Sequence, residues 1–134
     1  MTPVLVDSNV IIDIAEADPT WREWSEAKLA DLADNTVLVI NPIIYAEVSV
    51  GYGSPDELEA VIGTDAFRRE PLPWEAAFLA GRCFQIYRRR GGERRSPLPD
   101  FFIGAHAAVM GYRILTRDAA RYRSYFPTVQ LIAP

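Results

Sequence analysis

The chain has 134 residues, 49% of them hydrophobic and 24% charged, a composition that excludes a disordered chain and fits one globular domain. Cys83 is the only cysteine, which rules out an internal disulfide and a cysteine-based metal site. The first residues lack the pattern of a secretory signal, and no apolar run has the length of a membrane span. We therefore expect a single cytoplasmic domain over residues 1–134 with no membrane partner.

The net charge of −4 hides an asymmetry between the two halves of the chain. Residues 1–67 contain 13 acidic and 2 basic residues, whereas residues 68–134 contain 5 acidic and 12 basic ones. Five of the arginines lie in the stretch RRRGGERR at 88–95. Such an asymmetry indicates either an anionic partner on one face or ordinary solvated helix surfaces, and charge alone leaves both open.

The predicted elements alternate between short apolar strands and helices. In chain order they are a strand over 4–6, helices over 8–16 and 20–35, a strand over 37–40, helices over 42–50 and 55–63, a weak strand candidate over 68–72, helices over 74–90 and 99–111, a strand over 113–116, a helix over 118–126 and a strand over 128–132. The strands VLV and VLVI are continuous apolar runs, which are typical of parallel strands buried on both faces. This order predicts an α/β fold, a three-layer α/β/α sandwich with a mostly parallel central sheet.

Four acidic residues fall near strand ends or helix starts. Asp7 directly follows the first strand, and Asp118 follows the strand over 113–116 by two residues. Glu47 lies about a turn and a half into the helix after the second strand, and Asp100 lies in the first turn of the helix over 99–111. In a parallel sheet these positions can converge on one edge. Each aspartate alone is more simply explained as a helix cap, but a carboxylate at Glu47, in an apolar helix, requires a cation nearby.

Gathered carboxylates repel one another unless a cation lies between them. With one histidine and one cysteine available, a zinc site is disfavoured, and oxygen ligands suit Mg²⁺, with Mn²⁺ as the alternative. Such a cluster beside an arginine-rich segment indicates chemistry on a phosphodiester. The metal would generate hydroxide from water, and the arginines would hold a nucleic acid backbone.

Four stretches in the expected order resemble the acidic motifs of the PIN-domain ribonucleases, and within them the VapC-like toxins of type II (VapBC) toxin–antitoxin pairs. They are VLVDSNVII, IIYAEVSVGY, LPDFFIGAHA and ILTRDAARY. The resemblance spans nearly the whole chain. Any one motif is a weak signal, whereas four in order form a strong one.

The resemblance implies a Mg²⁺- or Mn²⁺-dependent endoribonuclease. Its catalytic and metal-binding acids would be Asp7, Glu47, Asp100 and Asp118, and two further residues, Asn9 and Thr116, would help to order the site. It also implies a homodimer and a small cognate antitoxin whose carboxyl-terminal segment lies across the active-site groove. Transfer RNA and ribosomal RNA are the target classes in the family.

Several arginines are candidates for RNA contact. Arg94 and Arg95 follow two glycines in a predicted loop, and Arg90 precedes those glycines, where it also fits a solvated helix end. Arg117, beside Asp118, either contacts phosphate or pairs with a neighbouring acid, and the sequence does not decide between the two.

Other chemically distinctive residues have plainer explanations. His106 lies about 240° around the helix from Asp100, which predicts a packing or hydrogen-bonding role. Cys83 sits in an apolar helix and is expected to be inert core. Trp21 and Trp24 either belong to a partner groove or pack against the core.

Other function classes fit less well. A receiver or dehalogenase-like phosphoryl-transfer domain also places an aspartate after a strand, but the only lysine is Lys28, in a predicted surface helix, and Asn9 stands where a second acid is needed. A non-catalytic RNA-binding module would gain nothing from four repelling carboxylates. A PIN-fold RNA-binding or RNA-processing protein that is not a toxin remains the main alternative.

Overall fold

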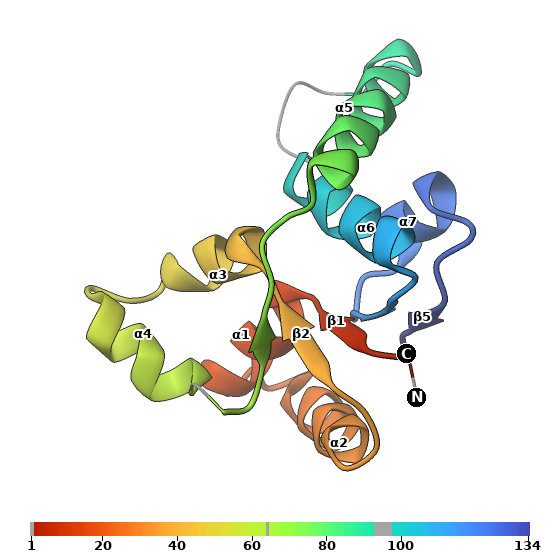
Figure 1. The fold of residues 1–134 in the computed structure, drawn as a ribbon. Helices are drawn as coiled ribbons and strands as arrows, with labels where there is room; N and C mark the ends of the chain where they lie inside the picture. The colour runs from red at the N-terminus through yellow and green to blue at the C-terminus, as the bar shows by residue number, and fades with distance from the viewer. Residues whose placement is uncertain (1, 64, 93–97) are drawn as a thin grey trace.

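The computed structural model describes residues 2–63, 65–92 and 98–134. Its strands are β1 (Val4–Val6), β2 (Leu38–Ile40), β3 (Arg68–Arg69), β4 (Arg113–Leu115) and β5 (Leu131–Ile132). Its helices are α1 (Ser8–Ala15), α2 (Arg22–Ala33), α3 (Pro42–Ser49), α4 (Pro55–Ile62), α5 (Trp74–Arg89), α6 (Leu98–Met110) and α7 (Ala120–Tyr125). The strands form one sheet in the order β3-β2-β1-β4-β5, and every neighbouring pair is parallel (Figure 1).

The central strand β1 determines where the site begins. Its three residues, Val4 to Val6, are fully buried, and burial of each side chain stabilises the fold by roughly 1.5–3 kcal/mol. β1 pairs with β2 on one side and with β4 on the other. The residue that follows β1, Asp7, therefore leaves the sheet in the middle of its carboxyl edge.

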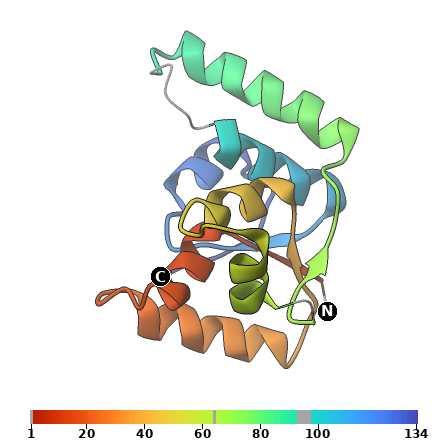
Figure 2. The ribbon, with the colours of Figure 1, turned by 90° about the vertical axis from the view of Figure 1, so that its left-hand side faces the viewer.

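The helices cover the sheet in two outer layers. α1 packs against α2, while α5 packs against α6, and Figure 2 shows α2 and α5 on opposite sides of the molecule with the strands between them. α3 contacts both α1 and α6. The predicted three-layer α/β/α sandwich is confirmed. No helix in the described ranges is long and apolar enough to cross a membrane.

A cluster of aromatic rings joins α5, α6 and α7. Phe101, which is fully buried in α6, lies with its ring centroid 5.0 Å from that of Tyr125 in α7 and 5.6 Å from that of Tyr87 in α5. Edge-to-face contacts of this kind stabilise by about 0.5–1.5 kcal/mol beyond the area that they bury. They hold the first turn of α6, which carries Asp100, close to α7.

The two outer strands are each three residues shorter than the sequence predicts, whereas β2 and β4 are each shorter by one residue. β3 ends before Pro71, which has no N–H for the ladder, although a strand over 68–72 was the weak candidate. β5 starts at Leu131 rather than at residue 128, because the chain first turns back on itself with the Val129 N–H bonded to the Phe126 carbonyl at 3.0 Å. Both differences lie at the outer strands and leave the central carboxyl edge unchanged.

Candidate active site

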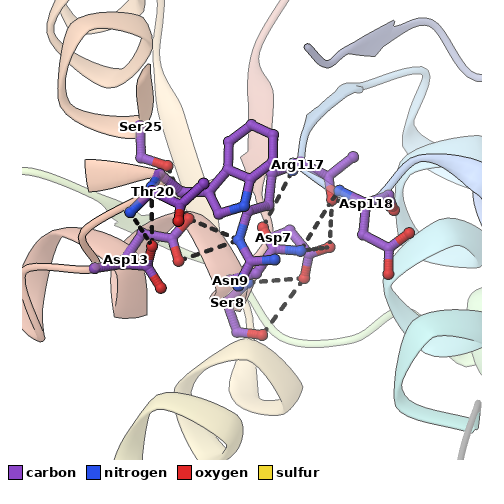
Figure 3. A network of polar contacts seen from close by, with 11 residues as sticks. Asp7, Ser8, Asn9, Asp13, Thr20, Ser25, Arg117 and Asp118 are labelled. Carbon is purple, nitrogen blue, oxygen red and sulfur yellow. Dashed lines mark hydrogen bonds and ion pairs between the residues drawn. The ribbon is translucent and has the colours of Figure 1, made fainter. Parts of the chain in front are cut away.

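Asp7 is the most enclosed of the four predicted acids. It caps α1, with its Oδ1 accepting a hydrogen bond from the Ser8 backbone N–H at 2.8 Å, and it is only 3% exposed. Its Oδ2 accepts hydrogen bonds from the hydroxyl groups of Tyr122 and Thr116, both at 2.9 Å. These donors fix the orientation of the carboxylate, which Figure 3 shows near Asp118.

Burial dominates the electrostatics of Asp7. Its pKa is raised from 3.8 to about 6, chiefly because a charged carboxylate is poorly solvated inside the protein. The hydrogen bonds from Tyr122 and Thr116 lower the pKa in part, while the negative charge of Asp100 raises it further. At neutral pH Asp7 is thus an ion held at an energetic cost.

Glu47 and Asp100 are electrostatically coupled to Asp7. Glu47, half-buried on α3, accepts a hydrogen bond from the Ser8 hydroxyl at 2.9 Å, and its pKa is raised by burial and by the charges of Asp7 and Asp100. The pKa of Asp100 is also raised, first by burial, although its ion pair with Arg121 lowers it. Three carboxylates from β1, α3 and α6 therefore share one electrostatic environment.

Asp118 lies at the solvent side of this cluster. It is exposed, and its charge raises the pKa of Asp100, which places the two carboxylates within interaction range. Its backbone N–H donates to the Thr116 hydroxyl at 3.1 Å. That contact shapes the turn after β4, so that α7 begins at Ala120 rather than at Asp118.

Asn9 and Thr116 connect the first acid to the fourth. The single proton of the Thr116 hydroxyl goes to Asp7, and its lone pairs accept from the Asp118 N–H and from the Asn9 amide at 3.2 Å. The amide oxygen of Asn9 accepts from the Arg117 N–H at 3.3 Å. The loop after β4 is therefore tied to the start of α1.

A buried ion pair, which the sequence did not reveal, supports this loop from the other side. Asp13 of α1 is 1% exposed and accepts from Arg117 Nε at 2.8 Å and from the Ser25 hydroxyl at 3.0 Å (Figure 3). The Arg117 guanidinium also lies 5.8 Å from the ring centroid of Trp21. The sequence left two partners open for Arg117, a phosphate or a neighbouring acid. In the structure Arg117 is paired with an acid, Asp13.

The segment before α2 brings Trp21 to this ion pair. The carboxylate of Asp18 accepts from the backbone N–H groups of Thr20 and Trp21, both at 2.9 Å, so this segment forms a turn, and α2 begins at Arg22 rather than at residue 20. Trp21 and Trp24 are partly buried and pack edge to face with centroids 6.2 Å apart. Both tryptophans thus have a packing role, and their place in a groove for a partner stays a prediction.

Sequence reasoning also missed two residues of α7. Tyr122, which is 1% exposed, bonds Asp7, and Arg121 bonds Asp100 through Nη1 and Oδ2 at 2.8 Å. Their partners lie 115 and 21 positions away in the sequence, so no local spacing pattern could have found these contacts.

The remaining RNA-contact candidates lie at or beyond the end of α5. Arg90 is exposed, with its guanidinium 5.4 Å from the ring centroid of Tyr125 on α7. Arg94 and Arg95 lie outside the described residues. Contact of these arginines with RNA stays a prediction.

His106 and Cys83 have structural roles. His106 is fully buried, and its Nδ1 lies 2.9 Å from the amide nitrogen of Asn41, which donates to it. Burial lowers the pKa of the imidazole, so it is neutral at pH 7. Cys83 is buried in α5. The predicted packing and hydrogen-bonding role of His106 and the core position of Cys83 are confirmed.

The donor set fits a hard divalent cation by its chemistry. All four acids offer oxygen ligands, and those with raised pKa values gain from a positive charge. As they stand, however, no three His, Cys, Asp or Glu side chains in the described ranges form a group close enough to hold a metal ion. Asp100 is turned to Arg121 instead. Metal binding at this site thus requires side-chain adjustment.

The fold and the site define an α/β protein with an acidic cluster at the carboxyl edge of a parallel sheet. A family model of the PIN domain matches residues 4–126, and the chain belongs to the PIN domain family. PIN domains are generally nucleases. The resemblance seen in the sequence is thereby confirmed.

Solved structures that share this fold include chains of toxin–antitoxin complexes. VapBC2 from Rickettsia felis, bound to a DNA fragment from its promoter, has a chain 16% identical to this one, with 98% of each chain covered and a TM-score of 0.76. FitAcB from Neisseria gonorrhoeae gives 20% identity, 96% of each chain and a TM-score of 0.70. A chain of a toxin–antitoxin complex from Klebsiella pneumoniae is 21% identical to this one, with 94% of each chain covered and a TM-score of 0.70. No curated protein matched the chain.

Asp7→Asn is expected to stabilise the metal-free protein at pH 7. Because the folded pKa of Asp7 lies above its unfolded value, the stability that protonation provides is complete below pH 3.8 and is lost as pH rises through about 6. The shift from 3.8 to about 6 corresponds to roughly 3 kcal/mol, which is the upper limit of the gain.

Urea unfolding in EDTA at pH 7 and pH 4 measures this effect. The gain should shrink below about 1 kcal/mol at pH 4. The control is Asp31→Asn, a change at an exposed acid of α2, which should leave stability within about 0.5 kcal/mol at both pH values. An equal gain at both pH values for Asp7→Asn would contradict the assignment of a buried, strained carboxylate.

Proposed function

We propose that this protein is a Mg²⁺-dependent endoribonuclease, with Mn²⁺ as the alternative metal, that hydrolyses phosphodiester bonds in RNA and is the toxin of a toxin–antitoxin pair. The observation that carries the proposal is the convergence of Asp7, Glu47 and Asp100. The pKa of each is raised, first by burial, and the charge of Asp100 raises the pKa values of both Asp7 and Glu47 further. Of the three, only Asp100 has a cationic partner among the described residues, and a partly buried acidic cluster with so little positive charge is typical of a cation site. Membership of the PIN domain family supports the same reaction class.

The metal would be held by Asp7, Glu47, Asp100 and Asp118. A divalent ion bound there would polarise the phosphate and lower the pKa of a water molecule. Asp7 contributes a carboxylate whose orientation is already set by Tyr122, Thr116 and Ser8, so little entropy is lost when it binds.

Glu47 is suited to handling a proton. One of its oxygens, Oε1, accepts a hydrogen bond from the Ser8 hydroxyl, and burial raises its pKa, so it holds a proton more readily than a free carboxylate does. Asn9 and Thr116 maintain the separation of Asp7 and Asp118 through their hydrogen bonds. Neither touches the substrate in this proposal.

The positive face for RNA lies at the junction of α5 and α6. Arg90 is exposed beside Tyr125, and in sequence it is followed by Arg94 and Arg95, while Asp100 lies in the first turn of the next helix, α6. Arginines next to aromatic rings suit the phosphates and bases of single-stranded RNA. Arg117 is engaged by Asp13 and would first have to release it. We assign Arg117 mainly to positioning the loop of Asp118.

Cleavage of RNA tests the nuclease directly. The purified protein is expected to cleave single-stranded or looped RNA in Mg²⁺ or Mn²⁺ and to stop when EDTA is added. Asp7→Asn, Asp100→Asn and Asp118→Asn should each slow cleavage by about a hundredfold or more, which corresponds to roughly 2.7 kcal/mol of lost transition-state stabilisation. Gel analysis of end-labelled RNA measures the rates.

Asp31→Asn is the matched control, since it removes an exposed carboxylate from α2, which lies away from the acidic cluster. It should cleave at the wild-type rate. Full activity in any of the three site variants, or activity that survives EDTA, would show that the metal-site assignment is wrong.

A cavity beside Glu47 supports an antitoxin partner. It has a volume of about 170 Å³, and apolar residues such as Ile12, Ala15 and Val48 line it together with two acids, Glu16 and Glu47. A segment of a small partner protein could place apolar side chains there and cover the acids. The structural neighbours come from complexes with an antitoxin. Transfer RNA and ribosomal RNA are the target classes that we propose.

An exposed apolar surface supports self-association. Trp74 and Phe78, one helical turn apart on α5, are 89% and 66% exposed. Large apolar side chains so placed are typical of an interaction site. We propose that a second copy covers this face in a homodimer. Sedimentation of the purified chain at twice its 15.0 kDa mass is the expected result, and a single-chain mass would contradict it.

Expression in a bacterial host tests the toxin assignment. Wild-type protein should arrest growth, and co-expression of the small protein encoded by the neighbouring gene should restore growth and allow the two proteins to be purified together. The inactive Asp7→Asn variant should not arrest growth and should still bind the partner. Normal growth with an active ribonuclease would instead favour the non-toxin RNA-processing function.

A further inference from the structure

Arg121 forms the only ion pair that involves one of the four acids within the described residues. Its Nη1 lies 2.8 Å from Asp100 Oδ2, and the two side chains are 38% and 33% exposed. Asp7, Glu47 and Asp118 have no such cationic partner in that part of the chain. At Asp100, the protein itself thus supplies, through Arg121, a positive charge of the kind that a metal ion would bring.

Arg121 can leave Asp100 without disturbing the fold. The next residue, Tyr122, is 1% exposed and bonded to Asp7, so it anchors α7 independently of Arg121. The Arg121 guanidinium also lies 5.7 Å from the ring centroid of Tyr87, a second surface on which it can rest. Its partly exposed, four-bond side chain can therefore exchange partners while the backbone stays in place.

A metal ion and Arg121 cannot both neutralise Asp100 fully. Both are cations, and Arg121 already occupies Asp100 Oδ2, so an arriving metal ion would find one oxygen taken and a positive charge beside the other. A guanidinium near a divalent ion is repelled by it, whereas RNA brings phosphates that attract a guanidinium in a bidentate manner. A metal ion that binds Asp100 should therefore release Arg121, and the phosphates of the arriving RNA then give Arg121 a new partner.

We propose that Arg121 is an internal counter-ion that pairs with Asp100 in the metal-free protein, yields Asp100 to the divalent cation and then binds the RNA backbone. This inference rests on the proposed ribonuclease function. It makes Arg121 a competitor of the metal and a partner of the substrate, two roles with opposite effects when the residue is removed.

Other arginines near the site do not fit this description. Arg117 is held by the buried carboxylate of Asp13, and Arg90 lies against Tyr125. Arg123, two positions further along α7, is exposed and forms no ion pair with a described residue. It shares the helix and the charge of Arg121 without the contact to Asp100, which makes it the matched control.

Mn²⁺ binding and RNA cleavage by the same variants test the proposal. Calorimetric titration with Mn²⁺, without RNA, should show about fivefold tighter binding for Arg121→Gln and Arg121→Ala than for wild type, the fold-change expected from losing an exposed ion pair. Arg121→Lys should retain the wild-type affinity, since it keeps the charge. Arg123→Ala should also bind Mn²⁺ as the wild type does.

Cleavage should change in the opposite direction. At saturating Mn²⁺, Arg121→Gln should cleave RNA about tenfold more slowly, because the phosphate contact is lost, while reaching half its maximal rate at a lower Mn²⁺ concentration. A residue with a merely structural role would weaken both metal binding and cleavage. Thermal melting of each variant verifies that it is folded. If Arg121→Ala does not fold, Arg121→Gln serves in its place, because glutamine retains hydrogen-bonding groups.

The outcomes separate this inference from the function on which it rests. Unchanged or weaker Mn²⁺ binding by Arg121→Gln, in a chain whose wild type binds Mn²⁺ and cleaves RNA, overturns the counter-ion role alone. Tighter Mn²⁺ binding with no RNA cleavage by any form supports competition at Asp100 and overturns the ribonuclease function. If neither wild type nor variant binds Mn²⁺, both are overturned.

Discussion

Burial of carboxylates that also repel one another, at the carboxyl edge of the sheet, is the constraint on which the rest of the site depends. The topology creates it, because β1, α3 and α6 bring Asp7, Glu47 and Asp100 to one place. Each of these groups carries a raised pKa, so each is less stable as an ion than it would be in water. A fold that only needed stability would place apolar residues there.

The protein offsets this cost with donors rather than with buried cations. Hydrogen bonds from Ser8, Asn9, Thr116 and Tyr122 hold Asp7, and one from Ser8 reaches Glu47, while Arg121 partly neutralises Asp100 from the solvent side. Among the residues that the structure describes, the one buried acid with an ion pair is Asp13, which bonds Arg117 outside the cluster. The carboxylate of Asp13, which supports the loop after β4, is thus neutralised by an arginine. The carboxylates of Asp7 and Glu47 have hydrogen-bond donors but no cationic partner among the described residues, which leaves them available to a cation.

The sequence predicts the parts of this arrangement that are encoded locally. Apolar runs such as VLV predict the buried strands. An acid directly after a strand, as at Asp7, predicts where the site lies. The contacts of Tyr122 with Asp7 and of Arg117 with Asp13 join residues more than 100 positions apart, which no local pattern encodes. In the sequence, Tyr122 is one aromatic residue among several in a short helix. Strand ends were also missed, since turns such as the one at Val129 depend on backbone bonds.

The central claim is that the acidic cluster is a divalent-cation site. Anomalous diffraction at the manganese edge, from crystals of the wild-type protein grown with Mn²⁺, tests it most directly. The account predicts a peak among Asp7, Glu47, Asp100 and Asp118, with the Arg121 guanidinium moved away from Asp100. No peak there at saturating Mn²⁺, with the ion pair of Arg121 and Asp100 intact, would contradict it.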